Sequence, residues 1–208
     1  MKSRGAHRKT EIKRSDILDA ATRCFAARGF DSATIREIAE EGGLLAGSLY
    51  YHFATKEEML HEIMRPFLED ILRETRRIAR GPGDPAQVLR ALIGASCAHA
   101  TTYRAQHQIL ISDRALFRDE GRHPYAREAW EAIRLEWQGI FRAGIAKQAF
   151  RPDLDPDVAT QIVTRMINSS VGWFSPKGRL TMEELVEFIS NLVLGGVTAN
   201  PSSQERGS

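Results

Sequence analysis

The segment from residue 34 to residue 56 constrains the fold more than any other part of the chain. Thr34 followed by Glu37 has the spacing of a capping box, which predicts that a helix begins there. The Gly42-Gly43 pair is expected to end that helix, because glycine readily adopts the left-handed conformation found beyond helix C-termini. A second helix of about two turns is predicted between residues 45 and 52. Two short helices joined by a tight glycine turn indicate a helix-turn-helix, whose second helix enters the major groove of DNA.

A third helix, predicted from about residue 11 to residue 28, supplies apolar side chains for the helix-turn-helix to pack against. The predicted core of the three helices consists of Leu18, Phe25, Ile35, Ile38, Leu49 and Phe53. That packing leaves the outer face of the second short helix free to contact DNA. The residues predicted to meet base edges are Arg36, Ala46, Gly47 and Ser48. At Gly47 the backbone can approach the groove closely, and the methyl group of Ala46 can meet a thymine methyl.

One run within this segment is specific: Leu-Leu-Ala-Gly-Ser-Leu-Tyr-Tyr-His-Phe at residues 44–53, followed by Lys-Glu-Glu-Met at residues 56–59. It resembles the signature of the TetR family of bacterial transcriptional regulators, and the resemblance covers roughly residues 12 to 62. Leu45 departs from the pattern, because the family usually has Ser or Thr there as the N-cap. The resemblance implies that phosphates are contacted by Thr34, Tyr50, Tyr51, His52 and Lys56.

Such phosphate contacts are chemically reasonable, because hydroxyl and ammonium groups can donate to phosphate oxygens and set the register without reading sequence. Two alternatives stay open. Tyr50 can instead pack into the core of the motif, and Lys56 can instead be solvated on a helix surface. If Lys56 does bind a phosphate, its replacement by alanine should weaken binding to all sequences alike and lower the salt slope by about one.

Positive charge gathers at the N-terminus, although the net charge of the chain is only +2. The first 14 residues carry Lys2, Arg4, Arg8, Lys9, Lys13 and Arg14 against a single acid, Glu11. A basic arm ahead of a helix-turn-helix can contact phosphates or reach into the minor groove. A solvated tail without DNA contacts is the alternative interpretation.

The whole sequence predicts an all-α protein of about nine helices, with no convincing strand pattern. Beyond the motif, helices are expected over residues 55–79, 85–103, 124–148, 156–173 and 181–196, with one or two short ones within 106–117. Pro66 should kink the helix that contains it. The predicted domains are a helix-turn-helix DNA-binding domain with its basic arm (residues 1–54), a helical ligand-binding and dimerisation domain (55–197) and a disordered tail (198–208).

The last two long helices, about 156–174 and 182–195, are too apolar for each to bury only one face. They are therefore predicted to form a homodimer interface, and the resemblance implies that this pair builds a four-helix bundle between subunits. A wider core within a monomer is the alternative.

A small-molecule pocket is predicted in the middle of the larger domain, because large aromatic side chains with a few polar groups suit an apolar ligand with a polar end. Its candidate lining residues are Cys97, Tyr103, Leu110, Trp130, Trp137, Phe141, Arg165, Met166, Asn168 and Trp173. The chain also resembles, loosely, the branch of the family that responds to acyl-coenzyme A thioesters from lipid or steroid breakdown.

Other classes of protein find little support. The chain has no Walker loop, no dinucleotide fingerprint and no nucleophile elbow. Cys97 and His99, two residues apart, do not share a helix face, so no metal site is expected there. With these motifs absent, neither a cofactor nor catalysis is expected. Cys24 and Cys97 are expected to be buried free thiols. No apolar run would span a bilayer and no signal peptide is visible, so a cytoplasmic location is expected.

These observations together predict a ligand-responsive transcriptional repressor. It would bind a palindromic operator in double-stranded DNA as a homodimer and be released by a small apolar or acyl-coenzyme A-like effector. The alternative is a DNA-binding regulator or architectural protein without a ligand, although DNA binding alone would not need the long domain after residue 80.

Overall fold

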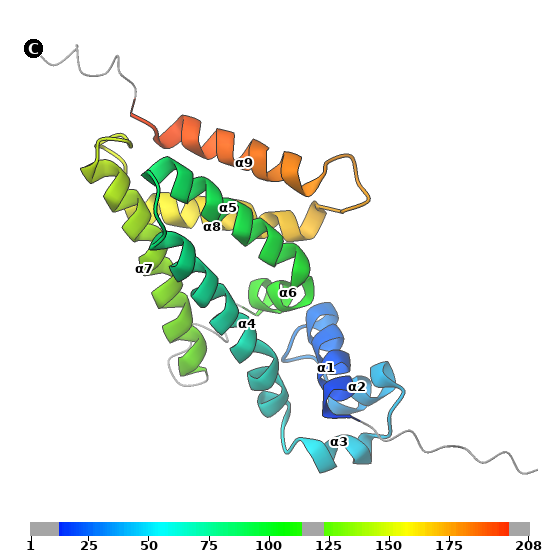
Figure 1. Ribbon diagram of the computed structural model, residues 1–208. Coiled ribbons are helices and arrows are strands. Elements are labelled where there is room, and N and C mark those ends of the chain that lie inside the picture. The colour runs from blue at the N-terminus through cyan, green and yellow to red at the C-terminus, as the bar shows by residue number, and fades with distance from the viewer. Residues whose placement is uncertain (1–12, 114–122, 200–208) are drawn as a thin grey trace, which may run out of the picture. The chain divides into compact units, whose positions relative to one another are not determined.

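The computed structural model describes residues 13–113 and 123–199 (Figure 1). In these ranges the chain forms helices joined by loops, with one isolated bridge between Phe150 and Thr198. The helices are α1 (Arg14–Arg28), α2 (Ile35–Gly42), α3 (Ala46–His52), α4 (Lys56–Ala79), α5 (Pro85–Thr102), α6 (Arg104–Ser112), α7 (Pro124–Ala146), α8 (Pro156–Trp173) and α9 (Met182–Val197). The all-α prediction is confirmed, and its helix ends agree with these to within a few residues. No helix in the described ranges is long and apolar enough to cross a bilayer.

The helices form two compact units, and the chain passes from one to the other inside α4, between Ile63 and Met64. The sequence analysis placed the boundary between residues 54 and 55. Met59, Leu60 and Ile63, in the first turns of α4, are buried and belong to the N-terminal unit. A single helix therefore contributes to both units.

The N-terminal unit packs α1 against α2 and α2 against α3. Four predicted core residues are fully buried, namely Phe25, Ile38, Leu49 and Phe53. Leu18 and Ile35 are only partly buried, which corrects the prediction for those two. Phe30, in the loop after α1, is a core residue that was not on the predicted list. Its buried ring meets that of Phe25 edge-on, with the ring centroids 5.1 Å apart.

The turn between α2 and α3 forms as the sequence predicts. Thr34 and Glu37 make the capping box: Glu37 N–H donates to Thr34 Oγ1 at 3.2 Å and Thr34 N–H donates to Glu37 Oε2 at 2.9 Å. Gly43 ends α2 in the left-handed conformation at φ +64°, and Leu44 N–H then donates to Ala39 O at 2.8 Å. This pattern satisfies the last carbonyls of α2 and fixes the direction in which α3 begins.

Arg14 at the start of α1 connects that helix to α3 and α4. Its guanidinium lies 3.9 Å from the centre of the Phe53 ring, donates to His52 O, and pairs with Glu58 at 3.2 Å and with Glu62. The pairing lowers the pKa of Glu62. Arg14 was predicted to belong to a DNA-binding basic arm, but these contacts place it inside the unit. Lys2, Arg4, Arg8 and Lys9 lie outside the described residues.

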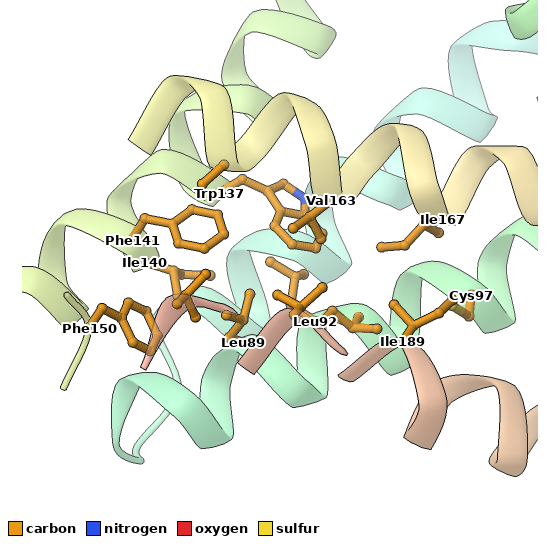
Figure 2. Packing of buried hydrophobic residues seen from close by; sticks show 14 of the residues in the cluster. Leu89, Leu92, Cys97, Trp137, Ile140, Phe141, Phe150, Val163, Ile167 and Ile189 are labelled. Carbon is orange, nitrogen blue, oxygen red and sulfur yellow. The ribbon is translucent and has the colours of Figure 1, made fainter. Parts of the chain in front are cut away.

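The C-terminal unit is a bundle in which α5 packs against α7, α8 and α9, and α7 packs against α8. Figure 2 shows buried side chains of these helices meeting in one apolar core. Its central members are Leu89, Leu92, Cys97, Trp137, Ile140, Phe141, Phe150, Val163, Ile167 and Ile189. Both cysteines are buried free thiols, as predicted.

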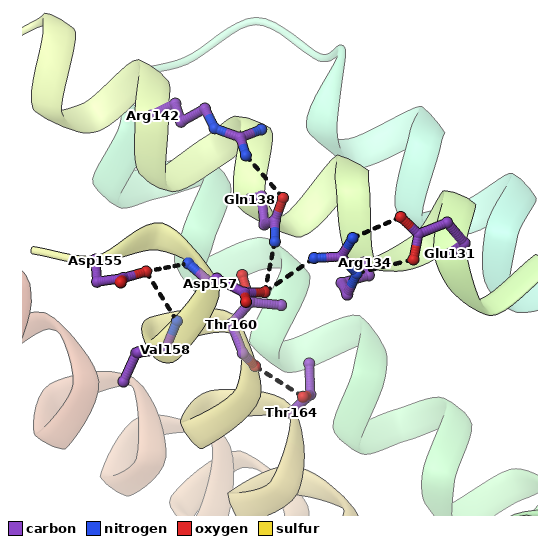
Figure 3. Close-up of polar contacts among 9 residues, drawn as sticks. All are labelled: Glu131, Arg134, Gln138, Arg142, Asp155, Asp157, Val158, Thr160 and Thr164. Carbon is purple, nitrogen blue, oxygen red and sulfur yellow. Dashed lines mark hydrogen bonds and ion pairs between the residues drawn. The ribbon is translucent and has the colours of Figure 1, made fainter. Parts of the chain in front are cut away.

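A polar cluster joins α7 to the first turn of α8 (Figure 3). Aspartate directly before a helix is a predicted N-cap, and Asp155 caps α8 by accepting from Asp157 N–H at 2.8 Å. The Asp157 carboxylate accepts from Arg134 Nη1 at 2.9 Å and from the buried Gln138 Nε2 at 2.7 Å. Arg142 in turn donates to Gln138 Oε1 at 2.8 Å. These bonds set the position of α8 along α7.

The first residues of the predicted disordered tail are ordered. Thr198 bridges to Phe150, and Ala199 N–H donates to Ala149 O at 3.2 Å. Residues 200–208 lie outside the described residues. The pairing closes the bundle beside Gly144, whose missing side chain leaves space for the Phe150 ring.

We therefore expect opposite effects from alanine at two glycines of α7. At Gly144 an added methyl group would overlap the buried Phe150 ring, so Gly144→Ala should destabilise the protein by about 1 to 3 kcal/mol. At Gly139, which is exposed and has no atom within 4 Å of an added methyl group, Gly139→Ala should stabilise by up to about 1 kcal/mol through helix propensity. Chemical denaturation measures both, and equal effects would contradict this account of Gly144.

Candidate functional site

The outer face of α3 is the surface predicted to read DNA, and it is accessible. Leu49 and Phe53 anchor α3 to the core of the N-terminal unit, which leaves Gly47 exposed and Ala46 and Ser48 half-exposed. The chain around Gly47 is open, because an added Cβ would meet nothing within 4 Å. Arg36 on α2 is also exposed and pairs only with its neighbour Glu40, at 3.0 Å, among the described residues. These are the four residues predicted to meet base edges.

Aromatic side chains flank this surface. Tyr51 is 88% exposed and Tyr50 is 62% exposed, so the alternative in which Tyr50 packs into the core is wrong. His52 is half-buried, and its ring meets that of Tyr51 edge-on at 5.4 Å. The two phenol groups are therefore available to phosphates or bases, whereas His52 presents only part of its ring.

Leu45 is a feature of the surface that the sequence reasoning did not count as functional. It is the N-cap of α3, makes no side-chain capping bond and is 78% exposed. A large exposed apolar side chain at the start of a recognition helix can contact a thymine methyl group. The signal was present in the sequence, since Leu45 stands where the resembled family has a capping hydroxyl.

Two residues expected at phosphates have other partners. The hydroxyl of Thr34 already donates its proton to Glu37 Oε2, at 2.9 Å, while the same oxygen caps α2. It therefore has no second proton to donate to a phosphate. Lys56 Nζ donates to the backbone carbonyls of Phe30, Asp31 and Ala33 at 2.7, 3.1 and 3.2 Å. An ammonium group has three protons to donate, so the carbonyls occupy all of them. The phosphate role predicted for Lys56 conflicts with this geometry.

Lys56 instead fixes the loop between α1 and α2 to the first turn of α4. Its Nζ also lies 4.5 Å from the centre of the Phe30 ring, which adds a cation–π contact. The surface-solvation alternative is equally unsupported, because the side chain is half-buried and fully hydrogen-bonded. Lys56 therefore holds the scaffold on which α2 and α3 are mounted.

The C-terminal unit contains a pocket of about 50 Å³ between α4, α5, α6, α7 and α8. Its walls are Ile71, Glu74, Thr75, Leu92, Ala95, Ser96, His99, His107, Trp130, Ile133, Trp137, Thr164, Ile167 and Asn168. Ligand sites for drug-sized molecules typically enclose about 300 to 1,000 Å³. A ligand of that size would therefore have to displace side chains or helices to enter.

Three of the ten predicted pocket residues line this pocket, namely Trp130, Trp137 and Asn168. Tyr103 does not line the pocket, but its ring centroid lies 4.5 Å from that of His99, which does. Cys97, Leu110 and Phe141 are buried outside the lining, and Met166 packs against the core. Arg165 and Trp173 are exposed and do not reach the pocket, because they lie on the outer side of α8.

The sequence reasoning missed the polar part of the wall, above all His99 and His107. His99 Nδ1 and His107 Nε2 are 3.1 Å apart, and both rings pack against Phe67. Burial lowers the pKa of His99 to about 4 and that of His107 to about 3, so both imidazoles are neutral at pH 7. His99 continues the apolar stripe of α5, and this position on the buried face is the only feature of the sequence that could have indicated it as a pocket residue. Among the described residues no cluster of His, Cys, Asp and Glu could hold a metal ion.

Comparisons with known proteins agree with this two-part arrangement. Residues 17–63 match the model of bacterial regulatory proteins of the tetR family, and residues 82–197 match the model of the tetracyclin repressor-like C-terminal domain. The chain belongs to the TetR family. The two matched segments correspond to the two units, each with its own candidate site.

Among TetR-family proteins, the chain is similar to the HTH-type transcriptional repressor KstR2 of Mycobacterium tuberculosis, with 34% identity over 186 residues that cover 89% of this chain and 93% of that protein. It is 32% identical to KstR2 of Rhodococcus jostii over 197 residues, covering 90% and 92% of the two chains. The solved structure of the ketosteroid transcriptional regulator KstR2 of M. tuberculosis matches with a TM-score of 0.82 and 32% identity, over 91% of this chain and 98% of that one.

The contacts of Lys56 predict a stability effect at this member of the TetR family. Lys56→Met keeps much of the aliphatic side chain but leaves three carbonyl groups without their donor, so it should destabilise the N-terminal unit by about 1 to 3 kcal/mol. Lys177→Met, at an exposed loop position, is the control and should change stability little. Thermal unfolding measures both. Unchanged stability with a salt slope of DNA binding reduced by one would restore the phosphate role.

Proposed function

We propose that this protein is a dimeric, ligand-responsive repressor that binds a palindromic operator through α3. The observation that carries the proposal is the exposed outer face of α3, which is held on a helix-turn-helix by the buried Leu49 and Phe53. The similarity to proteins named transcriptional repressors, over nine-tenths of their length, supports repression rather than an architectural role.

On the operator, Arg36, Ala46, Gly47 and Ser48 would meet base edges, and Leu45 would add an apolar contact. Tyr50 and Tyr51 would donate hydrogen bonds to phosphates, with His52 beside them. Lys56, Arg14 and Thr34 would act indirectly, by fixing the loop and helix ends that carry these residues. The division separates residues that touch DNA from those that hold the surface in shape.

A carboxylate in the first turn of α3 tests this proposal. Gly47→Glu should fold normally, because the position is open, and should weaken binding to an operator fragment selected from random DNA by about a hundredfold or more, since it brings negative charge against phosphates. The matched control is Gly139→Glu, at another helical glycine with open space around it. Electrophoretic mobility shifts measure both. Operator binding that survives Gly47→Glu would move the DNA-reading surface away from α3.

The dimer is proposed to form through α8 and α9, because each presents apolar residues on two sides. Val163, Ile167, Leu185 and Ile189 are buried inside the unit. The other sides leave large apolar side chains exposed on these two helices, namely Val158, Ile162, Trp173, Phe188 and Leu192. Large apolar side chains exposed along two helices favour an interface with a partner over a surface open to water. A second copy of the same face would cover it in a two-fold arrangement.

A charge in this face should separate the subunits. Phe188 is 66% exposed, so Phe188→Glu should leave the monomer folded and shift the mass in solution from dimer to monomer. Leu135→Glu is the control, because Leu135 is similarly exposed but lies on α7. Light scattering at several concentrations reports the outcome. A wild-type protein that is itself monomeric would refute this interface.

The pocket would couple ligand binding to DNA through α4. Ile71, Glu74 and Thr75 of α4 form one wall of the pocket, while the first turns of the same helix belong to the helix-turn-helix unit. A ligand too large for the present cavity would displace that wall, and the displacement would be carried along α4. The name of the similar structure, a ketosteroid transcriptional regulator, supports a mainly apolar effector of the steroid type. A pocket with aromatic and polar walls favours this function over an architectural protein without a ligand.

A further inference from the structure

Two histidines of the pocket wall, His99 and His107, follow the partly exposed Asp70 in a row of polar side chains. Asp70 Oδ2 lies 3.4 Å from His99 Nε2, and His99 Nδ1 lies 3.1 Å from His107 Nε2. Arg73 pairs with the other oxygen of Asp70, Oδ1, and keeps the carboxylate in place. His107 is buried and lines the pocket, and its remaining nitrogen, Nδ1, has no hydrogen-bond partner among the described residues. His99 Nε2 makes no hydrogen bond either, because its 3.4 Å contact with Asp70 is only a charge contact.

The charge of Asp70 biases the position of the protons on the two neutral imidazoles. No hydrogen bond joins Asp70 to His99, but a carboxylate 3.4 Å away attracts an N–H and repels a nitrogen lone pair, which favours the His99 tautomer with its proton on Nε2. A neutral imidazole has only one N–H, and His99 Nδ1 must therefore accept. The proton between the rings then belongs to His107 Nε2, which leaves His107 Nδ1 as an unprotonated acceptor.

An unpartnered acceptor in a buried wall selects for a ligand that can donate to it. A buried polar atom without a partner costs free energy, and a ligand hydroxyl would remove that cost, whereas a carbonyl oxygen would be repelled. The lining contains neither Lys nor Arg, and its one charged residue is Glu74, paired with Arg77 at 2.6 Å. The enclosed part of the pocket therefore disfavours a carboxylate or a phosphate.

We propose that this pocket recognises an uncharged, mainly apolar alcohol, whose hydroxyl group donates a hydrogen bond to His107 Nδ1. The proposal rests on the proposed function insofar as it treats the pocket as the effector site, and it adds the chemical class of the effector. An acyl-coenzyme A-like effector would fit only with its charged portion outside the enclosed cavity. Trp130 and Trp137 supply the apolar surfaces for the rest of the ligand.

The first test needs no ligand. Nitrogen-15 NMR of the imidazole rings in the full-length protein at pH 7 distinguishes protonated from unprotonated nitrogens. We expect protonated Nε2 and unprotonated Nδ1 in both His99 and His107. A protonated Nδ1 on His107 would make it a donor and would overturn the proposal, whatever the protein does to DNA.

The second test compares cyclohexanol with cyclohexanone, which have the same number of heavy atoms but differ in whether the oxygen can donate. NMR titration of the dimer should show about tenfold tighter binding of the alcohol, as expected for a site whose buried acceptor is otherwise left unpaired. His107→Phe keeps an aromatic ring and should remove the preference. His61→Phe, in the N-terminal unit, should retain it.

Three outcomes would contradict the proposal: equal binding of the two probes by the wild-type protein, no binding of cyclohexanol up to its solubility limit, or a preference that survives His107→Phe. Operator affinity is measured separately with and without cyclohexanol. A selective pocket whose occupancy leaves operator affinity unchanged would count against the repressor switch and not against the chemistry of the pocket.

Discussion

The attachment of α4 to the N-terminal unit is the constraint on which both candidate sites depend. Lys56 binds three carbonyl groups of the loop after α1, and Arg14 at the start of α1 pairs with Glu58 and Glu62 of α4. Phe30 and Phe53 lie beneath these two cations. The cations thereby hold α1, the loop and α4 in a fixed relation, and α2 and α3 pack on the resulting frame. The same α4 then continues into the wall of the pocket.

The fold was largely predictable because its signals are local. Capping residues, glycine stops and apolar periodicity act within one or two turns, and they correctly placed the ends of α2 and α5 and the Asp155 cap of α8. The two-sided apolar pattern of α8 and α9 also appears in the structure as one buried and one exposed side. The structure divides the chain later than the sequence predicts, and the contacts that join the first turns of α4 to the N-terminal unit, such as those of Arg14 with Glu58 and Glu62, come from residues far apart in the chain.

The roles of individual polar residues were less predictable. Thr34, Lys56 and Arg14 have the donors that phosphates require, but the same donors satisfy a helix end, loop carbonyls and carboxylates within the unit. Residue type alone cannot separate these uses, because the partners come from distant parts of the chain. The prediction of the pocket lining was incomplete for a similar reason. Five helices contribute to the pocket, and His107 comes from a short helix with little periodic signal. The two tryptophans of the wall, Trp130 and Trp137, were predictable because they are large aromatic residues on the apolar face of an amphipathic helix.

The small volume of the pocket and the fixed attachment of α4 to the N-terminal unit together limit how a ligand could change the affinity for DNA. A ligand can shift an equilibrium only by its difference in affinity for the two states, typically about 1 to 3 kcal/mol in allosteric proteins. A ligand that fits the present 50 Å³ without displacing α4 would bind both states alike and would leave DNA binding unchanged. A larger ligand would displace the wall formed by Ile71, Glu74 and Thr75, and would therefore bind the two states with different affinities.

The motion of α4 would leave α3 unchanged. Because Lys56 and Arg14 fix the start of α4 to its unit, that displacement would move the helix-turn-helix as a rigid body and would not distort α3. The recognition surface would stay intact, and affinity would fall through the mismatch between two surfaces and two half-sites.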